Sequence, residues 1–352
     1  MRIAGFDIGG ANTDLAIVDF DKKGGIKNIG TDFKYLPMWS NKKDLKDTLL
    51  NLINNIVALD SVDAVGISMT AELVDAYETK KEGVLEIAKE VKDIFNIPLS
   101  FIGINGVLSY EDLKKNPLDV AAANWIATAQ IAGKIDENCI FIDTGSTTTD
   151  IIPVKNGCEC ATGRSDMVRL ATGELVYTGL LRTNISTFVD EISLDGNNYK
   201  LASELFAISA DVYNVLGKIA TEEYICDTPD GSGKSIEESR RRISRILCAD
   251  LDMLSFEDID NICKEIYKKQ IQQIMEGLNQ VSKRENLDLV ISTGLGKDIL
   301  ASSAARNLNL EVKSMNEFLT DEECIVAPAI GTAILVEKHL NSWKVFELLK
   351  NV

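Results

Sequence analysis

One ten-residue pattern occurs twice in this chain, at residues 6–15 and again at residues 142–151. The matching pairs, aligned without gaps, are Asp7 and Asp143, Gly9 and Gly145, Thr13 and Thr149, and Asp14 and Asp150. In each copy an apolar run leads into a turn of small polar residues, and a second apolar run follows, which predicts two strands joined by a Gly-rich turn. Two such hairpins so far apart predict two structurally related domains that face one another.

The rest of the sequence alternates between helical and strand patterns. Helical spacing and short apolar runs alternate, which favours an α/β class with mixed sheets. We expect helices over 45–59, 84–95, 119–132, 201–223, 236–274 and 327–340, strands over 64–67, 99–103 and 287–292, and an irregular segment over 155–200.

The length of 352 residues suits two domains, each with its own core. The terminal helix is rich in small residues and is expected to return to the first domain. That domain is therefore expected to span 1–118 plus 328–352, and the second to span 119–327. The small, apolar helix over 119–132 is expected to lie between them.

Composition excludes several classes of function. The formal net charge of −17 argues against nucleic acid and anionic membranes as partners, because both need clustered cations. Seven scattered cysteines fit reduced thiols, and the first residues leave no room for a signal peptide, so we expect a cytoplasmic protein. The single histidine, His339, argues against Ser-His-Asp, Cys-His and histidine-ligated metal chemistry.

The one basic cluster consists of four arginines in an expected helix beside two glutamates. A solvated helix face is the favoured interpretation, and a clamp for phosphate or carboxylate groups is the alternative. The cluster comprises Arg240, Arg241, Arg242 and Arg245.

The two hairpins carry the clearest chemical signal. Glycines let backbone N–H groups approach a phosphate, and hydroxyl and amide side chains add further donors. The aspartates cannot bind phosphate directly, so Asp7 and Asp143 are expected to hold Mg²⁺ instead. The alternative is a pair of ordinary hairpins with Thr-rich turns. The expected phosphate-binding residues are Gly9, Gly10, Asn12, Thr13, Gly145, Ser146, Thr147 and Thr148.

Two further segments resemble binding loops. Gly294 and Gly296 follow an expected strand and open a helix, so their backbone can approach a phosphate or a nucleotide base. The Gly-rich stretch over 163–182 carries several charged residues, which suits either a binding loop or a solvated connection with internal salt bridges. Its candidate binding residues are Arg164, Asp166, Arg169 and Arg182.

These motifs together resemble a known superfamily. The two hairpins, the late Gly-x-Gly and the terminal helix resemble the actin/hexokinase/Hsp70-like (ribonuclease H-like) fold, with two domains and an interdomain cleft. Within it, residues 143–150 and 163–182 resemble the hydantoinase A/oxoprolinase branch. Residues 6–13, 121–125 and 173–179 are similar to the archaeal tetrahydromethanopterin-linked one-carbon transfer proteins, a group that includes a methanofuran biosynthesis enzyme.

The resemblance implies a transferase that uses diphosphate as its leaving group. It implies that 5-(aminomethyl)-3-furanmethanol diphosphate is joined to γ-glutamyltyramine as an aryl ether, with Mg²⁺ near Asp7 and Asp143 and no requirement for ATP. Asp150, the third residue we place in the catalytic set, is a candidate to take the phenol proton, as are Asp14 and Asp166. The arginines of the 163–182 stretch are candidates to bind carboxylates or the diphosphate.

Two other functions stay open for a chain with this pattern. One is an ATP-dependent small-molecule kinase or hydantoinase/oxoprolinase-type hydrolase, and the other is a nucleotide-binding protein without turnover. In all three cases the ligands are small molecules, and a homodimer is a possible assembly.

Overall fold

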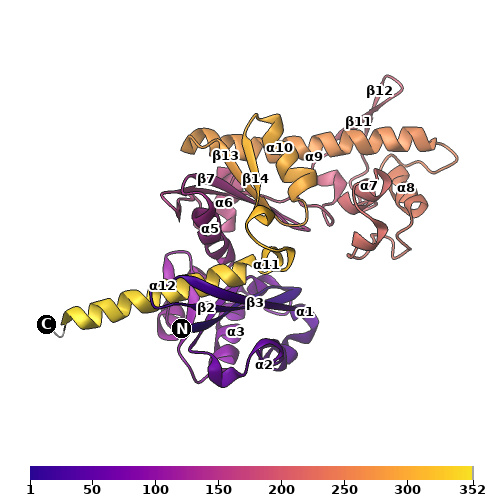
Figure 1. Ribbon diagram of the computed structural model, residues 1–352. Helices are drawn as coiled ribbons and strands as arrows, with labels where there is room; N and C mark the ends of the chain where they lie inside the picture. Colours follow the sequence, from indigo (N-terminus) through magenta and orange to yellow (C-terminus); the bar gives the residue numbers. More distant parts are fainter. Residues whose placement is uncertain (351–352) are drawn as a thin grey trace. The chain divides into compact units, whose positions relative to one another are not determined.

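The computed structural model describes residues 1–350, with side chains described through Asn341 (Figure 1). The chain forms two compact units. Unit 1 comprises Met1–Glu137, Val154–Cys160 and the chain from Phe318 onward, and unit 2 comprises Asn138–Pro153 and Ala161–Glu317.

Unit 1 is built on a six-stranded mixed sheet with the order β3-β2-β1-β4-β5-β6. Its first three strands pair antiparallel, and β4 and β5 then continue the sheet in parallel with β1. The strands are β1 (Arg2–Ile8), β2 (Asn12–Phe20), β3 (Ile26–Tyr35), β4 (Ala64–Met69), β5 (Leu99–Gly103) and β6 (Gly106–Leu108).

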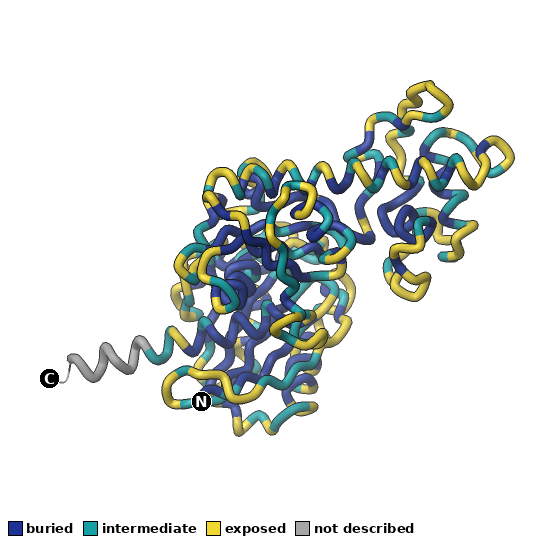
Figure 2. Tube along the Cα trace, turned by 45° about the horizontal axis from the view of Figure 1, so that its top comes forward, coloured by how far each residue is buried: buried dark blue, intermediate teal, exposed yellow. Residues whose placement is uncertain are grey.

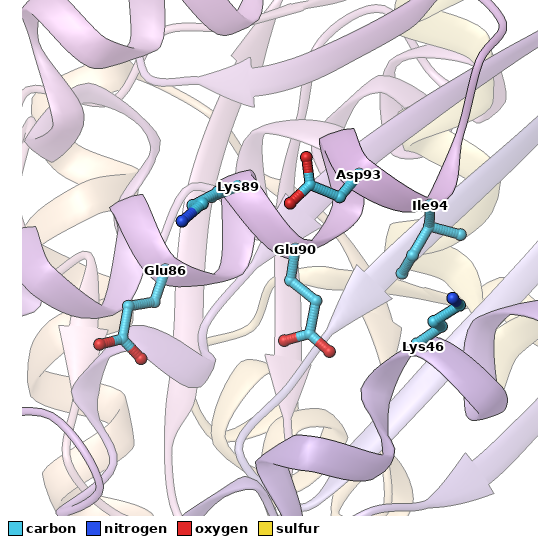
Figure 3. Close-up of a pocket in the computed structure, with 6 residues that line it drawn as sticks. All are labelled: Lys46, Glu86, Lys89, Glu90, Asp93 and Ile94. Carbon is cyan, nitrogen blue, oxygen red and sulfur yellow. The ribbon is translucent and has the colours of Figure 1, made fainter.

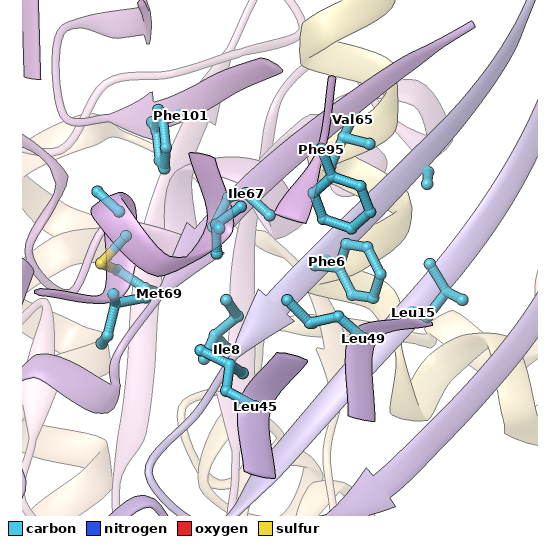
Figure 4. Close-up of a cluster of buried hydrophobic side chains, with 14 of the residues drawn as sticks. Phe6, Ile8, Leu15, Leu45, Leu49, Val65, Ile67, Met69, Phe95 and Phe101 are labelled. Atoms are coloured by element: carbon cyan, nitrogen blue, oxygen red, sulfur yellow. The ribbon is translucent and has the colours of Figure 1, made fainter. Parts of the chain in front are cut away.

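Helices cover both faces of this sheet. On one face, α2 (Leu45–Ile56) and α3 (Lys80–Ile94) close a core in which the rings of Phe6 and Phe95 stack with centroids 6.1 Å apart (Figure 4). On the other face, α12 (Ala327–Lys350) packs against β1, β2 and β4 and against α5 (Asn124–Ile135). Short helices α1 (Met38–Asn41), α4 (Tyr110–Lys115) and α11 (Asp321–Ile325) complete the unit.

The packing of α12 explains why unit 1 is larger than expected. At Gly331 a Cβ would collide with the backbone of Ala127, so α5 and α12 meet at van der Waals contact of their main chains. The helix expected to lie between the domains therefore belongs to unit 1. The division falls after Glu137, whereas the sequence placed it after residue 118.

Unit 2 repeats the strand order of unit 1. Its sheet has the order β10-β8-β7-β13-β14, with β9 paired to β8, and β13 lies parallel to both β7 and β14. The prediction of two structurally related halves is confirmed by this shared order. The strands are β7 (Cys139–Thr144), β8 (Thr149–Lys155), β9 (Cys158–Glu159), β10 (Leu175–Val176), β13 (Leu289–Thr293) and β14 (Glu311–Ser314).

A largely helical insertion extends unit 2. It contains the hairpin of β11 (Glu191–Leu194) and β12 (Asn197–Lys200), followed by α7 (Ser209–Val215), α8 (Ile236–Arg245) and α9 (Phe256–Glu285). Figure 2 shows the hairpin tip exposed, whereas β7 and β13 are buried along almost their whole length. After β13 the chain forms a short π-helix over Lys297–Ala301 and then α10 (Ser302–Asn307).

Two expectations for this region are wrong. Residues 155–200 are not irregular, because they contain β9, α6 (Asp166–Thr172), β10 and the β11–β12 hairpin. Residues 201–223 are not mainly helical, because only α7 and one 3₁₀ turn form there. Elements of two to seven residues are too short to give a recognisable period.

The arginine cluster on α8 is not a solvated face. Arg242 is completely buried, and its guanidinium pairs with Asp211 at 2.8 Å and with Asp230 at 3.1 Å. Arg240 pairs with Asp260 at 2.9 Å. These pairs fasten α8 to α7 and α9, so Arg242 is held by carboxylates of the protein and serves the insertion's structure.

None of the helices in the described part of the chain combines the length and the apolar composition that a bilayer crossing requires.

Candidate active site

In unit 1 the turn between β1 and β2 is held in a defined shape by backbone hydrogen bonds. The Gly9 amide donates to the Asn12 carbonyl at 2.8 Å, and the Gly10 carbonyl accepts from the Met38 amide at 2.8 Å. The amides of Gly10 and Ala11 donate to no acceptor within the described residues. The turn therefore offers unpaired N–H groups.

The turn between β7 and β8 has the same arrangement in unit 2. The Gly145 amide donates to the Thr148 carbonyl at 2.9 Å, and the Ser146 carbonyl accepts from the Arg182 amide at 2.8 Å. Across the part of the chain that the structure describes, the amides of Ser146 and Thr147 have no acceptor.

The two turns are thus equivalent in hydrogen bonding as well as in sequence. In each, the glycine two residues after the aspartate closes the turn, and the next residue's carbonyl is tied to a donor from a later segment. Consecutive N–H groups left without an acceptor form a concavity that binds anions. Each unit therefore carries one turn whose amides are suited to bind an anion.

Asp7 lies at the base of the first turn and is almost fully buried. Its Oδ1 accepts a hydrogen bond from Ser68 Oγ at 2.7 Å, and its Oδ2 accepts one from Asn124 Nδ2 at 3.2 Å. Burial raises the pKa of Asp7, and these two hydrogen bonds act against that rise. The parallel register of β4 positions Ser68, and the first turn of α5 positions Asn124, so sequence motifs alone did not reveal either partner's role.

Asp14 lies opposite Asp7 on β2. Burial, with a smaller contribution from the charge of Asp7, raises the pKa of Asp14 to about 8. Its carboxyl makes no hydrogen bond or ion pair with any other described residue. A carboxyl in this state is well suited to exchange a proton near neutral pH.

The other two carboxylates considered as proton acceptors are both engaged by one arginine. Arg169 is buried on α6, pairs with Asp150 Oδ1 at 2.5 Å and lies 3.4 Å from Asp166 Oδ1. It also donates to the Glu174 carbonyl at 3.1 Å. These bonds give Arg169 a structural role and engage Asp150 and Asp166, whereas Asp14 has no such partner among the described residues.

Glu174 organises the loop before α6 and is a residue that the sequence did not single out for this role. Its side chain is fully buried and accepts hydrogen bonds from the amides of Thr162 at 2.7 Å and Gly163 at 2.6 Å. Thr172 Oγ1 donates to it at 2.9 Å, and Arg284 of α9 forms an ion pair with it. A glutamate inside a Gly-rich segment was the only signal available in the sequence.

The Gly-x-Gly segment of Gly294 and Gly296 lies against the second turn. At Gly294 the φ is +87°, and a Cβ there would collide with the Asp143 carboxylate and the Thr144 carbonyl. The Gly296 amide donates to the Thr144 carbonyl at 2.8 Å. The parallel pairing of Thr293 with Asp143 brings the segment there.

The remaining predicted binding residues differ in accessibility. Asn12 is exposed in the first turn, whereas Thr13 is fully buried in the core beneath it. The side chains of Arg164 and Arg182 are exposed in unit 2, and the backbone of Arg182 is bonded to the second turn. Thr13 thus supports the first turn from beneath, and the backbone of Arg182 is hydrogen-bonded to the second turn.

The carboxylates near the first turn fit a divalent cation. Asp7 and Asp14 lie side by side in a setting that raises both pKa values, and a bound cation would favour their charged forms. No group of three or more His, Cys, Asp or Glu suited to a metal occurs among the described residues. A magnesium ion shared by Asp7 and Asp143 stays a prediction, because these residues belong to different units.

A surface hollow elsewhere in unit 1 shows no sign of this chemistry. It lies between α2 and α3, and Figure 3 shows charged side chains of both signs around it. No residue of the Asp-Gly turn lines it, so we do not assign it to the active site. Its lining residues are Lys46, Glu86, Lys89, Glu90, Asp93 and Ile94.

The sheets of the two units have the same strand order, and each has an Asp-Gly turn after its first strand. These features define the actin/hexokinase/Hsp70-like class. The family model of hydantoinase/oxoprolinase matches residues 63–339, and the chain belongs to this family.

The relatives extend this match over almost the whole chain. A protein of Methanocaldococcus jannaschii, "(4-{4-[2-(gamma-L-glutamylamino)ethyl]phenoxymethyl}furan-2-yl)methanamine synthase", is 40% identical over 97% of this chain and 99% of its own length. A protein of the same name from Methanococcus vannielii is 37% identical over 60% of this chain and 96% of its own length. Among solved structures, nucleotide-free acetone carboxylase has a TM-score of 0.58 at 12% identity, covering 95% of this chain and 70% of that one, which shows the fold alone.

Proposed function

We propose that this chain synthesises (4-{4-[2-(γ-L-glutamylamino)ethyl]phenoxymethyl}furan-2-yl)methanamine in methanofuran biosynthesis. The donor is 5-(aminomethyl)-3-furanmethanol diphosphate, and the acceptor is the phenol of γ-glutamyltyramine. Two relatives named for this product support the proposal. The structural observation that carries it is the pair of equivalent turns whose N–H groups lack acceptors among the described residues, because a diphosphate leaving group needs such donors.

The reaction exchanges one C–O bond for another. The bond between the furanyl methylene and the diphosphate oxygen breaks, and its electron pair leaves with the diphosphate. The furan ring stabilises the positive charge at the methylene, and the phenol oxygen forms the new ether bond there. The phenol proton passes to Asp14 in its ionised form, which a bound cation would favour and which has no cation partner among the described side chains.

The chain's own residues favour this step by preorganisation. The turn amides offer hydrogen bonds to the charge that develops on the diphosphate, and they are already fixed by the bonds at Gly9 and Gly145. Mg²⁺, when bound, would neutralise part of the same charge, with Asp7 as the candidate ligand at the first turn and Asp143 at the second. The proposed reaction does not consume ATP.

We place the reaction in the cytoplasm, with small molecules as the ligands. The seven cysteines are an odd number scattered along the chain, which suits reduced thiols in a reducing compartment. The assembly into a homodimer stays a prediction.

Diphosphate release tests the proposal directly. The protein with Mg²⁺ should release diphosphate and form the aryl ether only when both the furan diphosphate and γ-glutamyltyramine are present. Asp7→Asn and Asp143→Asn should each lower kcat roughly 100-fold or more, because each removes a metal-binding charge beside an anion turn. Asp60→Asn, on an exposed surface turn, is the matched control and should have wild-type turnover.

Other outcomes would contradict the proposal. Wild-type turnover in both turn variants would refute the metal–diphosphate site. Steady release of ADP from ATP without aryl ether would identify an ATP-dependent kinase or hydrolase instead. Saturable nucleotide binding without either product would indicate a non-catalytic nucleotide-binding protein.

A further inference from the structure

The second turn is held from behind by residues 178–183, which we call the backing segment. This segment lies between β10 and a 3₁₀ turn at Ile185–Thr187. The amides of residues 180–182 donate to the carbonyls of Gly145 and Ser146 at 2.8–3.0 Å. Two consecutive carbonyls of the turn therefore face the backing segment.

These bonds also fix the direction of the two turn amides that have no acceptor among the described residues. The peptide bonds here are trans, so the N–H of each peptide group points opposite to its C=O. The Gly145 carbonyl shares a peptide group with the Ser146 amide, and the Ser146 carbonyl shares one with the Thr147 amide. Both amides therefore point away from the backing segment, and both residues are only half-buried, so an anion can reach them.

The backing segment touches the turn most closely at Gly179. A Cβ on Gly179 would lie 2.5 Å from the nitrogen of Thr147 and 2.7 Å from the carbonyl carbon of Ser146. The two main chains are thus in direct contact, with no side chain between them that could absorb a shift. Any displacement of Gly179 must move the peptide group that carries the Thr147 amide.

A buried glutamine of α9 fixes this point of contact. Gln270 is fully buried, and its Nε2 donates to Thr178 Oγ1 and to the Gly179 carbonyl, both at 2.9 Å. Its Oε1 accepts a hydrogen bond from the buried hydroxyl of Tyr213 on α7 at 2.6 Å. That bond determines which way the side-chain amide is turned, because the oxygen must face the hydroxyl donor. All of these residues belong to unit 2.

Two hydroxyl groups share the Gly179 carbonyl with Gln270. Thr183 Oγ1 and Ser209 Oγ each donate to it at 3.1 Å. Thr183 belongs to the backing segment itself, and Ser209 opens the seven-residue helix α7. Gln270 makes the shortest of the three bonds and ties the segment to the 30-residue helix α9.

We propose that Gln270 is a positioning residue for the second turn, an inference that rests on the proposed function. It acts through Gly179 and makes no contact with the substrate. By holding Gly179 in place, it keeps the amides of Ser146 and Thr147 directed at the diphosphate of the furan donor, on which negative charge develops as the C–O bond breaks. Without this bond the chain keeps its fold, but the turn binds diphosphate less tightly.

Three substitutions separate this positioning role from a general effect on stability. Gln270→Leu keeps a side chain of similar volume but removes both donor bonds. Tyr213→Phe keeps the ring and removes only the hydroxyl that orients the glutamine amide. Gln272→Leu is the matched control, because Gln272 is exposed on the same helix, where it donates to Glu276 at 3.3 Å.

The KM of each substrate reports whether the turn itself is affected. Gln270→Leu should raise the KM for the furan diphosphate about tenfold and lower kcat about tenfold, while the KM for γ-glutamyltyramine stays within about twofold of wild type. Tyr213→Phe should raise the same KM about threefold. Gln272→Leu should have wild-type constants. A loss of folded protein alone would lower the apparent kcat without changing the KM of one substrate.

Binding of inorganic diphosphate tests the inference apart from the reaction. In calorimetric titrations with diphosphate and Mg²⁺, the affinity should fall about tenfold in Gln270→Leu, about threefold in Tyr213→Phe and not at all in Gln272→Leu. Tyr213→Phe carries the test by itself if Gln270→Leu does not fold.

The outcomes distinguish this inference from the proposed function. If the wild type forms no aryl ether but the Gln270 and Tyr213 variants still lose affinity for diphosphate, the proposed function fails and the positioning role stands. The inference is overturned if the wild type does not bind diphosphate, or if both variants match Gln272→Leu in KM and in affinity. It is also overturned if they raise the KM values of both substrates equally.

Discussion

Replacing Asp14 by asparagine should stabilise the protein at alkaline pH and remove its activity. In the folded chain the pKa of Asp14 is raised from the usual 3.8 to about 8, so the folded state keeps a proton that the unfolded state has released. The free energy of unfolding of the wild type should therefore fall as pH rises from about 4 to about 8. Asparagine keeps the shape of the side chain but carries no charge to desolvate.

The size of the effect follows from the shift and from the exposure of the side chain. Each pKa unit corresponds to about 1.4 kcal/mol, so a shift of about four units sets an upper limit of roughly 5–6 kcal/mol. The side chain is half-buried and keeps some contact with solvent, so screening reduces the penalty. We expect the Asn variant to exceed the wild type by about 2–3 kcal/mol above pH 8 and to match it near pH 4.

Urea unfolding of both proteins at pH values from about 4 to 9 measures this difference, and aryl-ether formation measures the activity. Turnover should fall roughly 100-fold if Asp14 takes the phenol proton. A stability difference that does not change with pH would refute the assignment of a raised pKa. A variant with increased alkaline stability and full turnover would instead refute the role of Asp14 as proton acceptor.

Two further changes test the second turn and the insertion. Gly294→Ala should abolish turnover and destabilise the protein, because its Cβ would meet the Asp143 carboxylate at a φ of +87°. The control Gly196→Ala, at a φ of +75° with open space around it, should cost only about 1–2 kcal/mol of backbone strain. Equal unfolding midpoints and equal turnover for the two variants would contradict this expectation. Arg242→Ala should cost about 3–5 kcal/mol in chemical unfolding, because it leaves the buried Asp211 without its cation, and a loss under 1 kcal/mol would show that the ion pair is dispensable.

The parts of the fold that the sequence predicted correctly are those set by near neighbours. A hairpin with a Gly-rich turn depends on about ten consecutive residues, and the paired copies at 6–15 and 142–151 revealed the duplication. Helices such as α2 and α3 were predicted because their apolar period repeats over several turns. The short elements between residues 155 and 200 lack such repetition and depend on a buried glutamate, Glu174, and on partners such as Arg284 of α9.

The same distinction between near and distant neighbours holds for the candidate site. The sequence alone determined that two Asp-Gly turns exist, that they match, and that glycines leave their amides accessible. Only the tertiary structure decided the state of each carboxylate, because the partners come from far away: Ser68 lies 61 residues from Asp7, and Asn124 lies 117 residues from it. The pKa of each aspartate depends on its burial and on contacts with residues distant in the sequence. Such contacts also give Asp150 a cation partner, Arg169, and leave Asp14 without one among the described residues.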